Sequence, residues 1–335
     1  MAELGILAAC FVVYGLISRR FERTVVTAPI AFVSAGLVLG ATGAVEFGFG
    51  GSEGTFEFAL GNEVVLIIAE IALVLVLFTD ASRMNVGALR GNAALPARLL
   101  GIGMPLTIVL GLVFALPLIS ELEFWEAAVI AAVLAPTDAA LGQAVVTSAR
   151  VPARIRQALN VESGLNDGLA VPLLTIFIAL AAAEEEVRGA GFWIRFALEQ
   201  IGYGAALGIG VGLVGGTLIQ LACSRNWVAP IYEQLSVAAL PIVAWAAADA
   251  VGGNGFIAAF VTGLAASKAV HDLGEMITDF TEDEGALLNL SIFFIFGALA
   301  ASVMDELTWQ LVVYGLLSLT VVRMLPVAVA MAGTG

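Results

Sequence analysis

The sequence predicts an all-α polytopic membrane protein, and three observations lead to that class. Hydrophobic residues make up 60% of the chain and charged residues only 13%, whereas a soluble domain carries about 25% charged residues. The mean hydropathy is +1.01. Apolar runs close to the roughly 20 residues that a helix needs to cross a bilayer recur from end to end. We therefore expect membrane-spanning helices throughout residues 1–335.

The apolar runs predict about eleven transmembrane helices. The second and ninth runs are short for a span, and the seventh is long enough to contain a re-entrant break. The expected cores are 4–18, 27–41, 62–80, 97–119, 125–147, 155–182, 191–222, 229–250, 254–267, 285–303 and 308–331.

The charges between the runs support this count, because Lys and Arg gather on the cytoplasmic side of a membrane. Basic residues follow the odd-numbered runs: Arg19, Arg20, Arg23, Arg83, Arg90, Arg98, Arg150, Arg154, Arg156, Arg225 and Lys268. Acidic residues follow even-numbered runs: Glu46, Glu53, Glu57, Glu121, Glu123, Glu126, Glu184, Glu185, Glu186, Asp305 and Glu306. We expect a cell-membrane protein with its N-terminus outside and the C-terminus of this chain in the cytoplasm.

Several classes of protein do not fit the composition. The net charge of -14 argues against nucleic-acid binding. Cys10 and Cys223 show no CxxC spacing and no partner histidine, so neither a disulfide nor a zinc site is expected. In the first run the basic cluster follows the apolar stretch, which indicates a retained helix and not a cleaved signal peptide. The acidic run "HDLGEMITDFTEDEG" is interpreted as solvated cytoplasmic surface.

Five ionisable residues lie deep inside expected spans: Glu70, Asp138, Glu162, Asp167 and Arg323. A charge at a helix centre costs about 2.5 to 3.5 kcal/mol even on the lenient insertion scale, so such groups pair or line a wet path. Glu70, in the third run, has three interpretations. It completes an ion shell through water, lies on a proton path, or is a protonated side chain bonded inside the bundle.

The fifth run contains "AAVLAPTDAALGQ", residues 131–143. Pro136 lacks a backbone donor and disfavours helical geometry at Ala135, so the helix should open between Ala135 and Thr137. Broken helices at membrane depth line cavities, and their freed carbonyls can bind cations. Asp138 and the Thr137 carbonyl would then face the next helix. A plain proline kink is the alternative.

The sixth run carries "VESGLNDGLAVPLL", residues 161–174. At 100° per residue, Ser163 and Asp167 share one helix face while Glu162 and Asn166 share the adjacent one. The first pair offers a carboxylate and a hydroxyl to a cation. Glu162 needs a basic partner, and Arg323 is the intramembrane cation available, so we expect a structural ion pair. The alternative is that these polar groups merely hold helices together.

The ligands proposed so far are all oxygen atoms, which suits a hard cation. Burial raises the pKa of a membrane carboxylate and a bound cation lowers it. A group that holds either a proton or a metal ion, but not both, is sufficient for exchange.

"ESGLNDG", "APTDAA", "EIALVLVLF", "GNGFIAAFVTGLA" and "VVRMLPVA" resemble motifs of the monovalent cation:proton antiporter-1 family, the NhaP-like sodium/proton antiporters related to sodium/hydrogen exchangers. The resemblance covers nearly the whole chain. It implies that Asp167 carries the ion and the proton and that Asn166 stands where electrogenic relatives have a second Asp. Thr137, Asp138 and Ser163 match ion-site positions, Glu70 matches a glutamate that acts through water, and Glu162 with Arg323 matches a structural pair.

The same resemblance implies a transporter and not an enzyme, with electroneutral Na+ for H+ exchange, dimeric assembly and no cofactor. It also implies an inverted-repeat fold of the NhaA/NhaP type with a broken helix near Pro136. "IAFVSAGLVLG" in the second run and "IAAFVTGLAAS" in the ninth show a trace of that repeat. An offset of seven helices reverses orientation, as an inverted repeat requires. We expect residues 1–335 to be a single transmembrane transporter domain, truncated before the last two of thirteen helices.

Two other classes remain open. A proton- or sodium-coupled solute symporter on a related fold would need a roomy organic-substrate pocket. An intramembrane aspartyl protease could use Asp138 and Asp167 as a dyad, but no GxGD-type motif surrounds either residue. A serine protease would need a base for Ser163, and the lone histidine, His271, lies in a loop.

Overall fold

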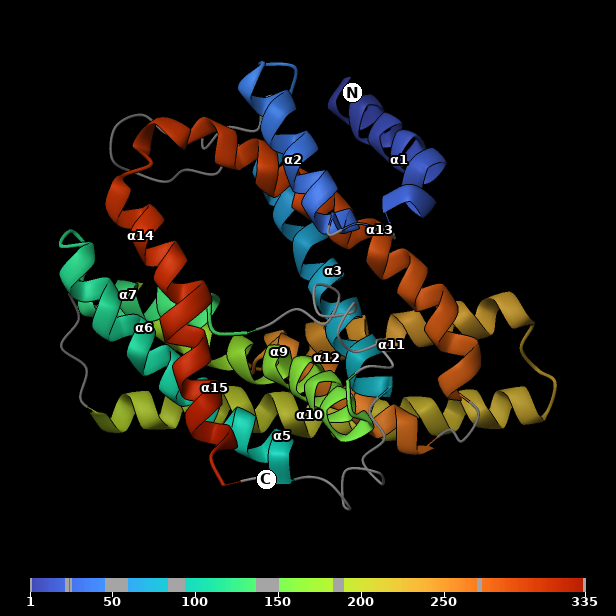
Figure 1. The fold of residues 1–335 in the computed structure, drawn as a ribbon. Coiled ribbons are helices and arrows are strands. Elements are labelled where there is room, and N and C mark those ends of the chain that lie inside the picture. Colours follow the sequence, from blue (N-terminus) through green and yellow to red (C-terminus); the bar gives the residue numbers. More distant parts are fainter. Residues whose placement is uncertain are drawn as a thin grey trace. The chain divides into compact units, whose positions relative to one another are not determined.

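In the computed structural model, all regular elements of the described part of the chain are helices; that part comprises residues 2–21, 24, 26–45, 60–83, 94–136, 151–182, 190–269 and 273–333 (Figure 1). The chain divides into two compact units. The first contains Met1–Leu73 and Phe280–Leu307, and the second contains Val74–Asp279 and Thr308–Gly335.

Each expected apolar run contains a described helix. The elements are α1 (Ala2–Phe21), α2 (Ala28–Ala41), α3 (Leu60–Arg83), α5 (Ala94–Arg98), η1 (Leu99–Gly103), α6 (Met104–Leu118), α7 (Phe124–Val133), α9 (Ala153–Ala182), α10 (Ala190–Ser224), α11 (Pro230–Ala250), α12 (Gly255–Ala269), α13 (Leu273–Ser302), η2 (Met304–Glu306), α14 (Trp309–Leu317), η3 (Ser318–Val322) and α15 (Arg323–Met331).

Within the described residues, five helical stretches are long and apolar enough to cross a membrane: Ala94–Leu118, Gly191–Ser224, Ile231–Ala250, Gly285–Ser302 and Trp309–Met331. Shorter apolar helices cover Ala28–Ala41, Phe124–Val133, Leu173–Ala182 and Gly255–Ala269. By their length and composition, the five long stretches indicate an integral membrane protein.

Two boundaries differ from the sequence-based expectation. The seventh run contains no break, because α10 is continuous from Ala190 to Ser224. The helix of the tenth run starts earlier than expected, at Leu273, inside the acidic segment. That segment has polar residues but few helix-breaking ones, so hydropathy alone did not reveal its helical start.

In the first unit, α2 and α13 are in backbone contact at glycines. A Cβ on Gly36 would overlap the carbonyl of Phe294, and one on Gly297 would overlap the carbonyl of Val33. Aromatic rings fill the space beside them, with the Phe11 and Phe32 ring centroids 4.7 Å apart. Small residues at the crossing let the two helices approach this closely.

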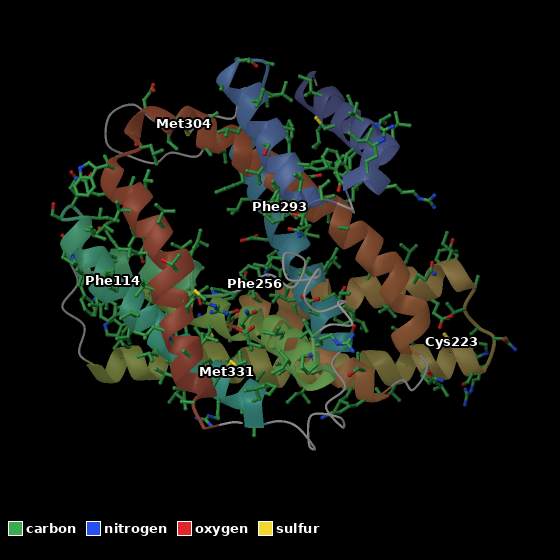
Figure 2. All side chains as sticks on the ribbon, viewed as in Figure 1. Phe114, Cys223, Phe256, Phe293, Met304 and Met331 are labelled. Carbon is green, nitrogen blue, oxygen red and sulfur yellow. The ribbon has the colours of Figure 1, made fainter. Side chains whose placement is uncertain are left out.

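In the second unit, α10, α11 and α12 pack side by side into a wall, and α10 joins α11 through a turn near Cys223 (Figures 1 and 2). Glycines spaced four residues apart on α10 face α12: Gly204, Gly208 and Gly212. A Cβ on Gly208 would lie 2.6 Å from the Ala258 carbonyl oxygen. The Thr262 hydroxyl on α12 donates to the Ala258 carbonyl of its own helix at 2.7 Å and lies 3.2 Å from the Gly208 carbonyl oxygen of α10. This wall is therefore closely interlocked.

Two long helices of the second unit each contain a π-helical turn. η1 interrupts the helix formed by α5 and α6, and η3 interrupts the one formed by α14 and α15. The two helices touch each other, and the Tyr314 hydroxyl donates to the Gly111 carbonyl at 3.3 Å. They are the fourth and eleventh expected runs, so they have the same offset of seven as the repeat seen in the sequence.

Candidate functional site

The helix of the fifth run ends where Pro136 predicts an opening, and this end of α7 is called the break below. α7 starts with a capping box, in which the Glu126 carboxylate accepts a hydrogen bond from the Glu123 backbone N–H at 2.9 Å. It ends at Val133, and Leu134 through Pro136 are not helical. Pro136 cannot supply the N–H that the next helical bond requires, and it disfavours helical geometry at Ala135. The opening of the helix is therefore confirmed as far as Pro136.

α9 presents one buried stripe to this break. Its members are spaced four residues apart: Ala158, Glu162, Asn166 and Ala170. Ala158 packs in an apolar cluster with Leu95, Leu99 and Ala330, and Ala170 in another with Met104, Ile108, Ala131 and Ala135. The two polar residues lie between these apolar layers. Asn166 is only 1% exposed, so this stripe places polar groups where water has little access.

Arg323 joins the break to the stripe. Its Nη2 donates to Glu162 Oε1 at 2.8 Å, and its Nη1 donates to the Ala135 carbonyl oxygen at 2.5 Å. The Glu162 side chain is 8% exposed and that of Arg323 19%. One guanidinium thus neutralises a buried carboxylate and also satisfies the carbonyl exposed by the end of α7. A cation at a helix C-terminus is also favoured by the helix dipole.

The π-turn η3 directly precedes Arg323. The turn ends at Val322, and the Arg323 backbone N–H donates to the Thr320 carbonyl. An extra residue in one turn rotates all following residues by about 100° around the axis. The direction of the Arg323 side chain therefore depends on this irregular turn as well as on its place in the sequence.

The energetics of the cluster follow from its burial. Removing one member of a buried ion pair costs about 3–5 kcal/mol, because the remaining charge loses its partner in a medium of low polarity. The Ala135 carbonyl would add the cost of an unsatisfied buried acceptor. This arrangement holds an opened helix end, α9 and α15 together, and it suits a structural role better than reversible ion binding.

The remaining predicted site residues are placed only in part. Ser163 and Asp167 lie on the continuous α9, but their side chains are outside the described part of the structure. Thr137 and Asp138 lie outside it altogether. Glu70 is half-buried on the part of α3 that belongs to the first unit. Across the described residues, no three His, Cys, Asp or Glu side chains gather in a group that could hold a metal ion.

Two features of the site were not anticipated from the sequence. One is the Ala135 carbonyl, which binds Arg323, whereas freed carbonyls at the break were expected to serve cations. Pro136 signals that this carbonyl is exposed, but not what fills the space beside it. The other is Asn254, whose Nδ2 donates to the Thr175 hydroxyl oxygen on α9 at 3.0 Å. Its sequence signals are its place in the motif "GNGFIAAFVTGLA" and its position just before an apolar run, where Asn is a preferred helix cap; neither indicates the bond to Thr175.

The family described as "Sodium/hydrogen exchanger, transmembrane" matches residues 6–335. The chain is 30% identical over 263 residues to a K(+)/H(+) antiporter NhaP of Alkalimonas amylolytica, an alignment that covers 78% of this chain and 42% of that protein. It is 29% identical over 218 residues to a probable Na(+)/H(+) antiporter of Schizosaccharomyces pombe, covering 60% of this chain and 28% of that protein. The alignments thus span less than half the length of these curated relatives.

Among solved structures, the sodium proton antiporter MjNhaP1 of Methanocaldococcus jannaschii at pH 8 matches with a TM-score of 0.76 and 18% sequence identity. The match covers 99% of this chain and 78% of that one. An electron-microscopy structure of the same antiporter matches with a TM-score of 0.75 and 19% identity, covering 100% and 78% of the two chains. At this identity the likeness establishes the fold.

Proposed function

The chain belongs to the transmembrane sodium/hydrogen exchanger family, and from this premise we propose that it exchanges a monovalent cation for a proton across the membrane by alternating access. The observation that supports this most directly is the buried cluster of Arg323, Glu162 and the Ala135 carbonyl at the break of α7. It holds the opened helix end against α9, which carries Asn166 and Asp167 about one turn beyond Glu162.

In this proposal Asp167 binds the cation and the proton in turn. Glu162 is already occupied by Arg323, so it does not serve as the carrier. Ser163, Thr137 and Asp138 supply further oxygen ligands, as hard cations prefer. Asn166 provides a neutral neighbour to the carboxylate, which agrees with electroneutral one-for-one exchange.

The transported cation is proposed to be Na+, which the resemblance of the motifs implies. K+ is the principal rival, because K(+)/H(+) antiporters are named among the curated relatives. We propose further that residues 1–335 form one transporter domain, that two copies assemble into a dimer, and that the N-terminus lies outside. The exchange requires no cofactor.

The test is cation-dependent proton flux in proteoliposomes that contain the full natural chain, with an imposed pH gradient and Na+, K+ or Li+ added in turn. We expect the wild-type protein to dissipate the gradient with at least one cation and Asp167→Asn to show no measurable flux, because an amide can neither titrate nor balance the cation. Asp249→Asn, at an exposed position near the end of α11, is the matched control and should behave as wild type.

Either of two results would contradict the proposal. One is a folded wild-type protein that moves no protons with any of the three cations. The other is an Asp167→Asn variant that exchanges at the wild-type rate.

A further inference from the structure

Asn254, the residue directly before α12, forms hydrogen bonds through both the oxygen and the nitrogen of its side-chain amide. The Asn254 Oδ1 accepts a hydrogen bond from the Ile257 backbone N–H at 3.0 Å, which caps the helix. Its Nδ2 donates to the Thr175 hydroxyl oxygen on α9 at 3.0 Å. In Figure 2 this end of α12 can be found at the labelled Phe256, the second residue of the helix. Asn254 is 5% exposed, so both bonds are sheltered from water.

The backbone at this end of α12 is fixed to its neighbours on the wall. The Asn254 N–H donates to the Gln200 carbonyl of α10 at 3.0 Å. A Cβ on Gly204 would lie 2.6 Å from the Asn254 carbonyl oxygen, and one on Gly255 would overlap the Trp245 ring of α11. Helices that approach this closely cannot slide past one another without large repacking. Asn254 is therefore held rigidly by α10, α11 and α12.

α9 lies between this wall and the helices around the break. Asn166 is buried on the stripe that faces the break, and Thr175, nine residues later, lies about 180° around the helix from it at 100° per residue. Thr175 is also about 12 Å along the axis from Asp167, at 1.5 Å per residue. The Asn254–Thr175 bond thus ties the C-terminal half of the proposed carrier helix to the wall.

We propose that the Asn254–Thr175 hydrogen bond forms in one access state and breaks in the other, which makes Asn254 a positioning residue for α9. This inference rests on the proposed exchange function. Alternating access requires contacts that differ between two states. A single neutral hydrogen bond adds little net stability, so it can bias the equilibrium between the states and still break in each cycle. In the state in which the bond is formed, the ion pathway is closed on the side of the membrane where the C-terminal end of α9 lies.

The decisive variant is Thr175→Val, which removes the hydroxyl acceptor and leaves the Asn254 cap on α12 intact. Losing the bond favours the state that is open at the C-terminal end of α9. The apparent KM for the cation should therefore fall about three- to tenfold when the cation is offered from that side, and it should rise from the other side. Thr175→Ser keeps the acceptor and should restore both values.

The readout separates positioning from simple structural damage. Partial unfolding would lower the maximal rate and leave both KM values unchanged. The inference is overturned if the two KM values of Thr175→Val stay at the wild-type level or shift in the same direction. Exchange by wild type in the same vesicles tests the proposed function separately. No wild-type exchange contradicts that function, whereas normal exchange with an unaltered Thr175→Val contradicts only this inference.

A second experiment locks the contact. In a background with Cys10→Ala and Cys223→Ser, the pair Thr175→Cys and Asn254→Cys is oxidised, with each single cysteine as a control. We expect the disulfide to lower the exchange rate at least tenfold and a reductant to restore it. A cross-linked protein that exchanges at its reduced rate would show that the contact is static. Failure to cross-link, both by oxidation and by a short bifunctional thiol reagent that spans the length of the lost Asn side chain, would show that the two positions do not meet.

Discussion

The α2–α13 contact of the first unit and the α12–α3 contact of the second have the same design. Gly36 and Gly263 each hold the seventh position of the similar segments "IAFVSAG" and "IAAFVTG". A Cβ on Gly36 would overlap the Phe294 carbonyl and meet the Ala298 N, while one on Gly263 would overlap the Phe78 carbonyl and meet the Ser82 N. In both cases the glycine faces a carbonyl and the amide four residues later. This is the internal repeat that the sequence suggested, now visible as matching helix contacts.

The two contacts differ in the polar groups around them. Asn254 caps α12 with its side chain, and the Thr262 hydroxyl, which donates to Ala258 within α12, also lies 3.2 Å from the Gly208 carbonyl oxygen. α2 starts at Thr27 without a side-chain cap, and its outer face is exposed at Val38. The glycine contact is therefore common to both units, whereas the side-chain cap is found at the α12 contact and not at the α2 contact. Substituting either glycine should lower the free energy of unfolding by a similar amount. Removing a polar group should lower it more in the second unit than in the first.

The largest effect should come from the polar cluster of the second unit. Arg323→Met leaves the Glu162 carboxylate and the Ala135 carbonyl without their donor, so the free energy of unfolding should fall by about 3–5 kcal/mol. Thermal unfolding in detergent would measure the loss. The double variant with Glu162→Leu should recover much of it, because a buried pair replaced by apolar groups is often tolerated. A single variant as stable as wild type would show that the cluster adds nothing.

An intermediate and equal effect is expected at the two glycines. Gly36→Ala and Gly263→Ala each place a methyl group against a backbone carbonyl, and overpacking of this kind typically costs about 1–3 kcal/mol. Gly15→Ala and Gly210→Ala, where nothing lies within 4 Å of the new Cβ, are the controls. They should gain stability, because alanine favours a helix over glycine by about 1 kcal/mol. Clearly unequal losses at Gly36 and Gly263 would break the comparison.

The smallest effect should come from the two helix starts. Asn254→Ala removes a cap and should cost about 1–2 kcal/mol. Thr27→Ala should change stability by less than about 0.5 kcal/mol, because Thr27 makes no side-chain cap bond. The same thermal assay compares them. Equal losses of unfolding free energy at both positions would mean that the side-chain cap of Asn254 adds no stability that Thr27 lacks.

Much of the helix layout could be predicted because hydrophobicity and length are local properties. The break at Pro136 follows from the chemistry of one residue, and pairing Glu162 with Arg323 follows from the need to balance buried charges. The helical start at Leu273 could not be predicted in this way, because its acidic residues are equally compatible with a solvated loop. The continuous α10 was also undecided, since glycines mark both breaks and close helix contacts.

The sequence by itself determined the membrane class and the approximate positions of the helices, and it predicted a set of candidate ion-site residues, because each of these follows from the cost of placing particular side chains in hydrocarbon. Only the tertiary structure decided that Arg323 reaches the Ala135 carbonyl, that π-turns interrupt two long helices, and that Asn254 bonds to Thr175. Each of these features depends on which helix, distant in the sequence, packs against the residue in question. Close packing selects that neighbouring helix only when the whole chain has folded.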